Sequence, residues 1–175
     1  MASTVIKNWD NKTWLSSKDY IKKFNSFLVK NIKLDSNSEI LDIGCGRGKI
    51  LGSLSSKLKL KNKPLGIDLI NHKDKDKRIK FKKINALNFF LTNKKKFDLI
   101  IIKQTIHLFQ LNEIKKFLDL LKKNLTSKGK IFIFSLDINK NEIPTFKLMK
   151  NKLAKSLIRD KKIFNLIIKS NNKVI

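Results

Sequence analysis

Short apolar runs and helical stretches alternate along this chain. Five runs have the length and apolar content of strands within a sheet, and they occupy residues 39–43, 65–67, 79–84, 97–102 and 130–136. Between them, apolar residues recur every three or four positions, which predicts helices over residues 16–33, 48–60, 87–91 and 111–125. This alternation predicts an α/β protein with a parallel sheet of about five strands and flanking helices.

The same pattern predicts a single domain over all 175 residues. We expect a cap helix within residues 1–37, a sheet-bearing core over 38–138 and a helical segment over 139–175. Residues 71–78 are almost wholly charged and too short for an ordinary crossover helix, so we expect a loop there. The apolar face of the first helix is predicted to contain Tyr20, Phe24, Phe27, Leu28 and Ile32.

Three glycines at alternate positions, Gly44, Gly46 and Gly48, separate the first predicted strand from a helix. Glycines at such a turn let the backbone approach a ligand without a Cβ, and the helix start offers unpaired N–H groups. A dinucleotide fingerprint that begins at Gly44 needs a third glycine at position 49, and a Walker phosphate loop also needs glycine there. Lys49 occupies that position, so neither phosphate-binding motif is present.

Two acidic residues narrow the ligand further. Asp42, just before the turn, would repel a pyrophosphate but suits a ligand with an ammonium group. Asp68, at the end of the second predicted strand, can accept hydrogen bonds from both hydroxyls of a ribose. A ligand with a ribose, a cationic amino-acid end and no phosphate points to S-adenosylmethionine.

Five segments in order then resemble a known family. They are LDIGCGRG at 41–48, GIDLI at 66–70, KINAL at 83–87, FDLIIIKQTIHLF at 97–109 and LLKKNLTSKGKIFIF at 120–134. Through them the chain resembles the class I S-adenosylmethionine-dependent methyltransferases over roughly residues 36–137. The resemblance implies a Rossmann-like sheet and an enzyme that transfers a methyl group by in-line displacement, with S-adenosylhomocysteine as the product.

The resemblance also implies a cofactor-binding set at the ends of the strands. The glycines and Asp42 would hold the methionine portion, and Asp68 would hold the ribose. Asn85 stands where the family often has an aspartate beside the adenine amino group, and an amide can still accept a hydrogen bond from it. The full set is Asp42, Gly44, Cys45, Gly46, Gly48, Asp68, Leu69, Asn85, Ala86 and Lys103.

Gln104 and His107 are the candidate catalytic residues, and Gln104 is expected to face both cofactor and acceptor. A base is required only if the acceptor must lose a proton, and a histidine has a suitable pKa for that task. The alternative is that His107 packs under the helix predicted over 111–125 or faces solvent. Cys45 is interpreted as a small buried side chain, because no partner base is adjacent.

The charge of +26 suggests a nucleic-acid partner, which we consider but do not favour. Among 40 basic residues only Arg47, Arg78 and Arg159 are arginine, the residue that makes bidentate contacts to phosphate and guanine. A bias towards lysine, isoleucine and asparagine is typical of A+T-rich coding. One cysteine excludes a disulfide framework and a cysteine-built metal site, and no metal is expected. Without a signal peptide or an apolar run that could span a membrane, we expect a cytoplasmic protein.

We therefore predict a small-molecule acceptor, with RNA methylation or non-catalytic cofactor binding as alternatives. No Asn-Pro-Pro-Tyr-type motif follows the fourth strand, and Ile106 stands where relatives that build cyclopropane rings on lipids usually have a glutamate. The family's C-terminal antiparallel hairpin has no room in the 39 residues after Leu136. We interpret the sequence as a truncated form of a longer protein, with a minimal variant as the alternative. The acceptor and the oligomeric state stay open.

Overall fold

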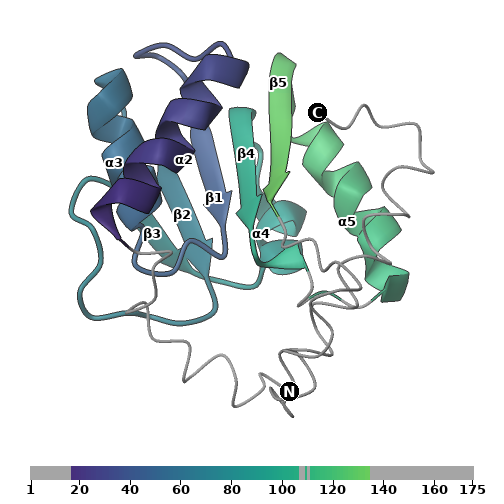
Figure 1. Ribbon diagram of the computed structural model, residues 1–175. Coiled ribbons are helices and arrows are strands. Elements are labelled where there is room, and N and C mark those ends of the chain that lie inside the picture. The colour runs from purple at the N-terminus through teal and green to yellow at the C-terminus, as the bar shows by residue number, and fades with distance from the viewer. Residues whose placement is uncertain (1–16, 107–108, 110, 135–175) are drawn as a thin grey trace, which may run out of the picture.

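The computed structural model describes residues 17–106, 109 and 111–134. They form a five-stranded parallel sheet with the strand order β3-β2-β1-β4-β5 (Figure 1). The strands are β1 (Ile40–Ile43), β2 (Leu65–Asp68), β3 (Lys80–Lys83), β4 (Phe97–Lys103) and β5 (Leu125–Phe134). The helices are α2 (Lys18–Asn31), α3 (Lys49–Leu58), α4 (Ala86–Thr92) and α5 (Leu111–Lys123). The predicted fold class is confirmed.

Helices cover both faces of the sheet, and each face has its own apolar cluster (Figure 1). Ile40, Leu99 and Ile101 pack with α2 and α3, whereas the alternate residues of the same strands pack with α4 and α5. Successive side chains of a strand point to opposite faces, so a central strand needs apolar residues at almost every position. This requirement explains why residues 99–102 form a continuous apolar run in the middle of β4.

Helix α2 begins at Lys18, two residues after the predicted start, because the Ser17 hydroxyl caps it by accepting a hydrogen bond from the backbone N–H of Tyr20 at 3.2 Å. The prediction that Phe27 lies on its buried face is wrong, since 49% of this residue is exposed. Phe27 sits at the margin of the helix–sheet contact, with its ring 5.9 Å from that of Phe132 in β5. Asn25 is buried instead, and its side-chain amide donates to the Ile50 carbonyl of α3 at 3.1 Å.

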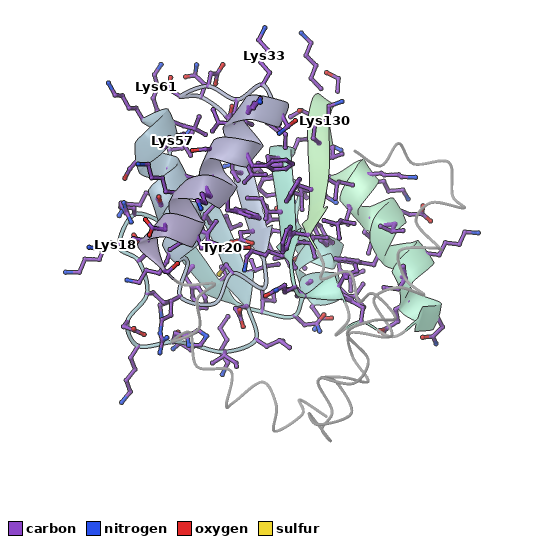
Figure 2. The ribbon with its side chains drawn as sticks, viewed as in Figure 1. Lys18, Tyr20, Lys33, Lys57, Lys61 and Lys130 are labelled. Carbon is purple, nitrogen blue, oxygen red and sulfur yellow. The ribbon has the colours of Figure 1, made fainter. Side chains whose placement is uncertain are left out.

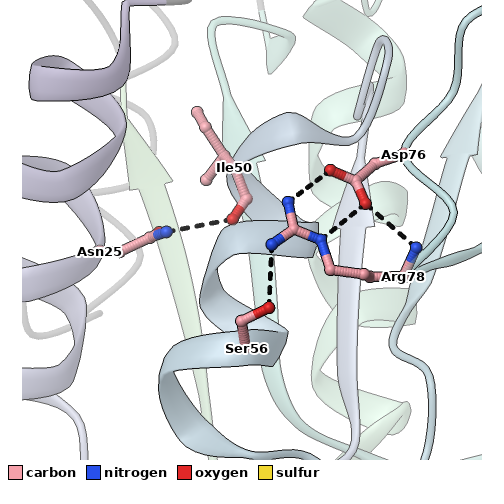
Figure 3. A network of polar contacts seen from close by, with 5 residues as sticks. All are labelled: Asn25, Ile50, Ser56, Asp76 and Arg78. Carbon is pink, nitrogen blue, oxygen red and sulfur yellow. Dashed lines mark hydrogen bonds and ion pairs between the residues drawn. The ribbon is translucent and has the colours of Figure 1, made fainter.

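The charged segment over 71–78 is a loop, as predicted, and two charged residues attach it to α3 (Figure 3). Arg78 donates Nε and Nη2 to the two carboxylate oxygens of Asp76, at 2.9 and 2.7 Å, and Nη1 to the Ser56 hydroxyl at 2.9 Å. These contacts hold the pKa of Asp76 below its usual range. The Asp76 carboxylate lies directly over Gly52, where an added Cβ would stand 2.4 Å from its carboxyl carbon.

Gly52→Ala is therefore expected to destabilise the protein, although alanine is the better helix former by about 1 kcal/mol. The new methyl group must displace a bidentate ion pair, which we expect to cost about 2–3 kcal/mol. Urea unfolding measures the difference, and Ser53→Ala, one position along in α3, is the matched control. A Gly52→Ala protein more stable than wild type would show that the loop is not held against this helix.

The boundary between α5 and β5 differs from the prediction. A helix was expected as far as Leu125 and a strand from Lys130, but α5 ends at Lys123 and β5 begins at Leu125. Leu125 pairs with Phe97 and Lys130 pairs with Leu99, so β5 carries three extra residues between these pairs. The residues between the predicted helix and the predicted strand therefore form an irregular, bulged stretch of β5. The last predicted strand residues, 135–136, and the segment 139–175 lie outside the described residues.

Strand β3 at the edge of the sheet consists of three exposed lysines and one aromatic residue. The exposed residues are Lys80, Lys82 and Lys83, and the ring of Phe81 is half-buried. The ammonium group of Lys75 lies 4.6 Å from the centre of that ring. The exposed side chains of β3 are therefore all lysines, and a further lysine lies against its one aromatic ring.

Candidate cofactor and active site

The order of the strands predicts a ligand crevice at the carboxyl ends of β1 and β4. From β1 the chain proceeds outward through β2 to β3, whereas from β4 it proceeds in the opposite direction to β5. In open parallel sheets, ligands bind at the carboxyl ends of the strands where the direction of winding reverses. The glycine turn at 44–48 follows β1, and residues 103–105 comprise the last residue of β4 and the two after it, so both segments lie at that point.

All three glycines of the turn have left-handed backbone conformations, with φ values of 73°, 55° and 70° at Gly44, Gly46 and Gly48. The turn is anchored to β2, because the backbone N–H groups of Gly44 and Cys45 both donate to the Ile67 carbonyl, at 2.9 and 3.2 Å. An added Cβ at Gly44 would stand 2.1 Å from Oγ1 of Thr105. The turn therefore depends on glycine both for its backbone conformation and for its approach to the end of β4.

Asp68 connects the end of β2 to this turn. One carboxylate oxygen accepts from the backbone N–H of Gly46 at 2.8 Å, and the other accepts from the backbone N–H of Ile70 at 2.9 Å. Each oxygen keeps a further lone pair for another donor. The carboxylate is thus fixed beside the glycine turn and can still accept hydrogen bonds from a ligand.

Asp42 is buried, with 5% of its surface exposed, at the end of β1. Burial raises the pKa of its carboxyl group to about 7, while the Lys103 ammonium opposes the rise and the Asp68 carboxylate adds to it. A cation that enters the crevice would stabilise the ionised form of Asp42, which burial disfavours. The site therefore favours a cationic ligand group beside Asp42.

We expect Asp42→Asn to change how the stability of the protein depends on pH. Because the pKa of Asp42 is raised on folding, wild type should lose stability as pH increases from about 4 to about 7, by an amount on the order of 4 kcal/mol. The variant lacks this titration, so its stability relative to wild type should increase across that range. Urea unfolding at pH 4, 6 and 8 measures the difference between the two proteins. A difference that is the same at all three pH values would contradict the raised pKa.

Cys45 was interpreted as a small buried side chain, but the structure shows it only half-buried. Burial is the largest cause of a raised pKa at its thiol, and the Asp42 and Asp68 carboxylates add to it. Its Sγ lies over β2, where a Cβ added to Gly66 would be only 2.6 Å away. A protonated thiol is a poor nucleophile, so the environment of Cys45 does not support covalent chemistry.

The end of β4 supplies the second wall of the crevice. Gln104 has a left-handed backbone with φ of 51°, and its N–H donates to the Phe134 carbonyl at 2.8 Å. Its side-chain nitrogen is buried and has no hydrogen-bond partner within the described part of the chain. A strained residue with an unused buried donor is typical of a binding or catalytic position. The Thr105 hydroxyl, which the sequence analysis did not single out, donates to the Lys103 carbonyl at 3.0 Å.

Asn85 and Ala86 lie at the start of α4. The side-chain oxygen of Asn85 accepts from the backbone N–H groups of Leu87 and Asn88, at 2.9 and 3.4 Å, and so caps the helix. A contact between Asn85 and an adenine stays a prediction, and the cap leaves mainly the side-chain NH₂ for it. Leu69 is 43% exposed beside Asp68. His107, the candidate base, lies outside the described residues.

The described residues contain no group of three or more histidine, cysteine, aspartate or glutamate side chains that could hold a metal ion. No helix among them is both long enough and apolar enough to cross a membrane.

Comparison with known proteins identifies the family. The model of a methyltransferase domain matches residues 34–172, which is more than half of the chain. The chain belongs to this methyltransferase family. The prediction of a class I S-adenosylmethionine-dependent methyltransferase is therefore confirmed, and S-adenosylmethionine is the cofactor of that class. No curated protein sequence matches the chain.

Solved structures agree with this methyltransferase fold. An S-adenosylmethionine-dependent methyltransferase from Archaeoglobus fulgidus has a TM-score of 0.59 and 19% identity, over 73% of this chain and 59% of that one. The plantazolicin methyltransferase BpumL, in complex with S-adenosylhomocysteine, has a TM-score of 0.58 and 24% identity, over 87% and 63%. A methyltransferase from Thiobacillus denitrificans, also in complex with S-adenosylhomocysteine, has a TM-score of 0.54 and 17% identity, over 74% and 54%. The chain thus spans less than two thirds of the length of each.

Proposed function

We propose that this methyltransferase domain transfers a methyl group from S-adenosylmethionine to a small-molecule acceptor. The observation that carries the proposal is the 2.8 Å hydrogen bond from the backbone of Gly46 to the carboxylate of Asp68. It joins the residue suited to a ribose to the turn suited to a close, phosphate-free ligand. The two features that the sequence offers separately thus form one continuous site.

The residues of the crevice fit S-adenosylmethionine in charge and in shape. Asp68 is held in place to accept from the ribose hydroxyls, and Asp42 offers a buried carboxylate to the ammonium group of the methionine portion. The left-handed glycines leave the space that side chains would fill. The Asp68 carboxylate and the ionised form of Asp42 disfavour a nucleotide that carries phosphates.

The bound cofactor supplies a methyl group on a sulfonium, which is already activated for in-line displacement. The protein therefore has to align the acceptor, hold it in the correct orientation and exclude water. The buried side-chain nitrogen of Gln104 can donate a hydrogen bond to an acceptor molecule that approaches along the end of β4. His107 would act as the base if the acceptor group must lose a proton.

The distribution of lysine supports a small acceptor over RNA. Lys33, Lys57 and Lys61 lie at the amino-end side of the sheet, opposite the crevice (Figure 2). Other lysines occupy the edge strand β3 and the last turn of α5. An RNA-binding surface concentrates its cations along the path to the reacting atoms, whereas a coding bias spreads them over every solvated face. The charge of +26 nevertheless makes RNA the alternative acceptor that an experiment must address.

Calorimetric titration of the wild-type protein with S-adenosylmethionine and S-adenosylhomocysteine tests cofactor binding. Methyl-labelled cofactor is then incubated with the protein and with cell extract separated into a small-molecule fraction and an RNA fraction. Label in the small-molecule fraction is expected. Label in RNA would favour the RNA alternative, and tight binding without transfer to either fraction would favour a non-catalytic module. A folded protein that binds neither compound would refute the proposal.

A further inference from the structure

Lys103 and Asp42 present opposite charges on the same face of the sheet. Asp42 pairs with Ile101 across β1 and β4, and Lys103 lies two residues further along β4. Side chains of paired residues in parallel strands point to the same face, as do residues two apart, so both charges face α2 and α3. The offset of two residues corresponds to about 6.6 Å along the strands.

Lys103 is held from the other side by the first turn of α2. Its ammonium nitrogen lies 5.2 Å from the centre of the Tyr20 ring, and that ring stacks on Phe24 with a centroid distance of 5.9 Å. Burial lowers the pKa of Lys103, and the Asp42 carboxylate is what opposes this effect. Burial also raises the pKa of Tyr20 to about 12, so the ring is neutral and offers its face to the cation.

Lys103 is half-buried, with the Tyr20 ring on one side and the carboxyl group of Asp42 on the neighbouring strand. Lys103 lies beside the position at which Asp42 favours the ammonium group of a ligand. Its positive charge would then face the carboxylate that neighbours this ammonium group in an α-amino acid. In an α-amino acid, the carboxylate carbon lies about 2.5 Å from the ammonium nitrogen. The two side chains therefore match the opposite charges of one α-amino-acid group.

We infer that Lys103, held by Tyr20, binds the carboxylate of the amino-acid end of S-adenosylmethionine and selects for cofactors that carry it. The inference rests on the proposed function and assigns one of its contacts. It also gives α2 a role in cofactor recognition, since the ring that positions the lysine comes from this helix and not from the glycine turn.

Decarboxylated S-adenosylmethionine, which keeps the ammonium group but lacks the carboxylate, provides the test. Calorimetry on wild type is expected to show binding of intact cofactor about 30-fold tighter than of the decarboxylated compound, as a charge-assisted contact allows. Lys103→Met should weaken the binding of the intact cofactor by a similar factor. Its affinity for the decarboxylated compound should stay within threefold of that of wild type. Lys49→Met, at an exposed lysine beside the same turn, is the matched control and should change neither.

Tyr20 gives an independent variant. Tyr20→Leu should weaken the binding of the intact cofactor about fivefold, because Lys103 loses the ring that holds it. Tyr20→Phe should bind the cofactor with wild-type affinity. Circular dichroism and thermal melting verify that each variant is folded.

The inference is overturned if Lys103→Met weakens the binding of both compounds equally, or if it weakens the binding of neither. If wild type binds neither compound, the proposed function fails as well. If wild type binds the intact cofactor and Lys103→Met has no selective effect, only the role of Lys103 fails.

Discussion

Gly44→Ala should abolish measurable binding of S-adenosylmethionine and destabilise the protein by about 2–4 kcal/mol. An alanine at a φ of 73° costs about 1–2 kcal/mol relative to glycine. In addition, its Cβ would meet three side-chain atoms of Thr105, at 2.1, 2.6 and 2.9 Å. Because the turn and the end of β4 form the two walls of the crevice, relief of this contact must move one of them. Urea unfolding and calorimetry measure the two effects.

The variant Thr105→Ala, alone and combined with Gly44→Ala, separates steric from conformational strain. It removes Oγ1 and the methyl group that the new Cβ would contact most closely. The double variant should therefore be more stable than Gly44→Ala, by about 1–2 kcal/mol, while its backbone strain persists. If Gly44→Ala instead binds cofactor like wild type, the turn does not approach the ligand as closely as we propose.

Asp68→Ala should weaken the binding of S-adenosylmethionine by about 100-fold or more. The substitution removes two expected hydrogen bonds from the ribose to a carboxylate, each worth about 1.5–3 kcal/mol. It also leaves the backbone N–H groups of Gly46 and Ile70 without the acceptors at 2.8 and 2.9 Å that fix the turn. Asp68→Asn should be intermediate, because an amide offers one acceptor oxygen where the carboxylate offers two.

Asp74→Ala is the appropriate control for this experiment. Asp74 is another carboxylate of the loop that follows β2, and it pairs with Arg47 of the glycine turn at 2.6 Å, but 64% of its side chain is exposed. An exposed pair contributes little, so this variant should bind cofactor within about threefold of wild type. Asp68→Ala binding within threefold of wild type would show that Asp68 serves only to hold the turn.

The strands and the glycine turn could be predicted because their causes are local. Strands buried on both faces must be apolar at almost every position, which fixed the position of β4, and a turn with three left-handed residues requires glycine. The fold and the family were therefore accessible from the order and spacing of a few segments. The positions of Asp42 and Asp68 followed from the same logic, since parallel strands bring their carboxyl ends to one edge.

The features that could not be predicted depend on contacts between distant segments. Ser127 and Gly129 suggest the end of a helix in isolation, but pairing with β4 accommodates them as extra residues within β5. Phe27 follows the helical period, yet its exposure is decided by where the margin of the sheet lies. The contact between Tyr20 and Lys103 joins residues 83 positions apart, and no local pattern identifies it.

The lysines of β3 have a consequence for the protein in the crowded cell. An unpaired strand edge is a template on which another chain can add and begin an aggregate. At the exposed edge of β3, a second copy that added itself in register would bring lysines against lysines, and the ammonium group of Lys75 already lies over the single aromatic ring. A lysine-rich composition that requires no function to explain it thus protects the newly made sheet from association along this side.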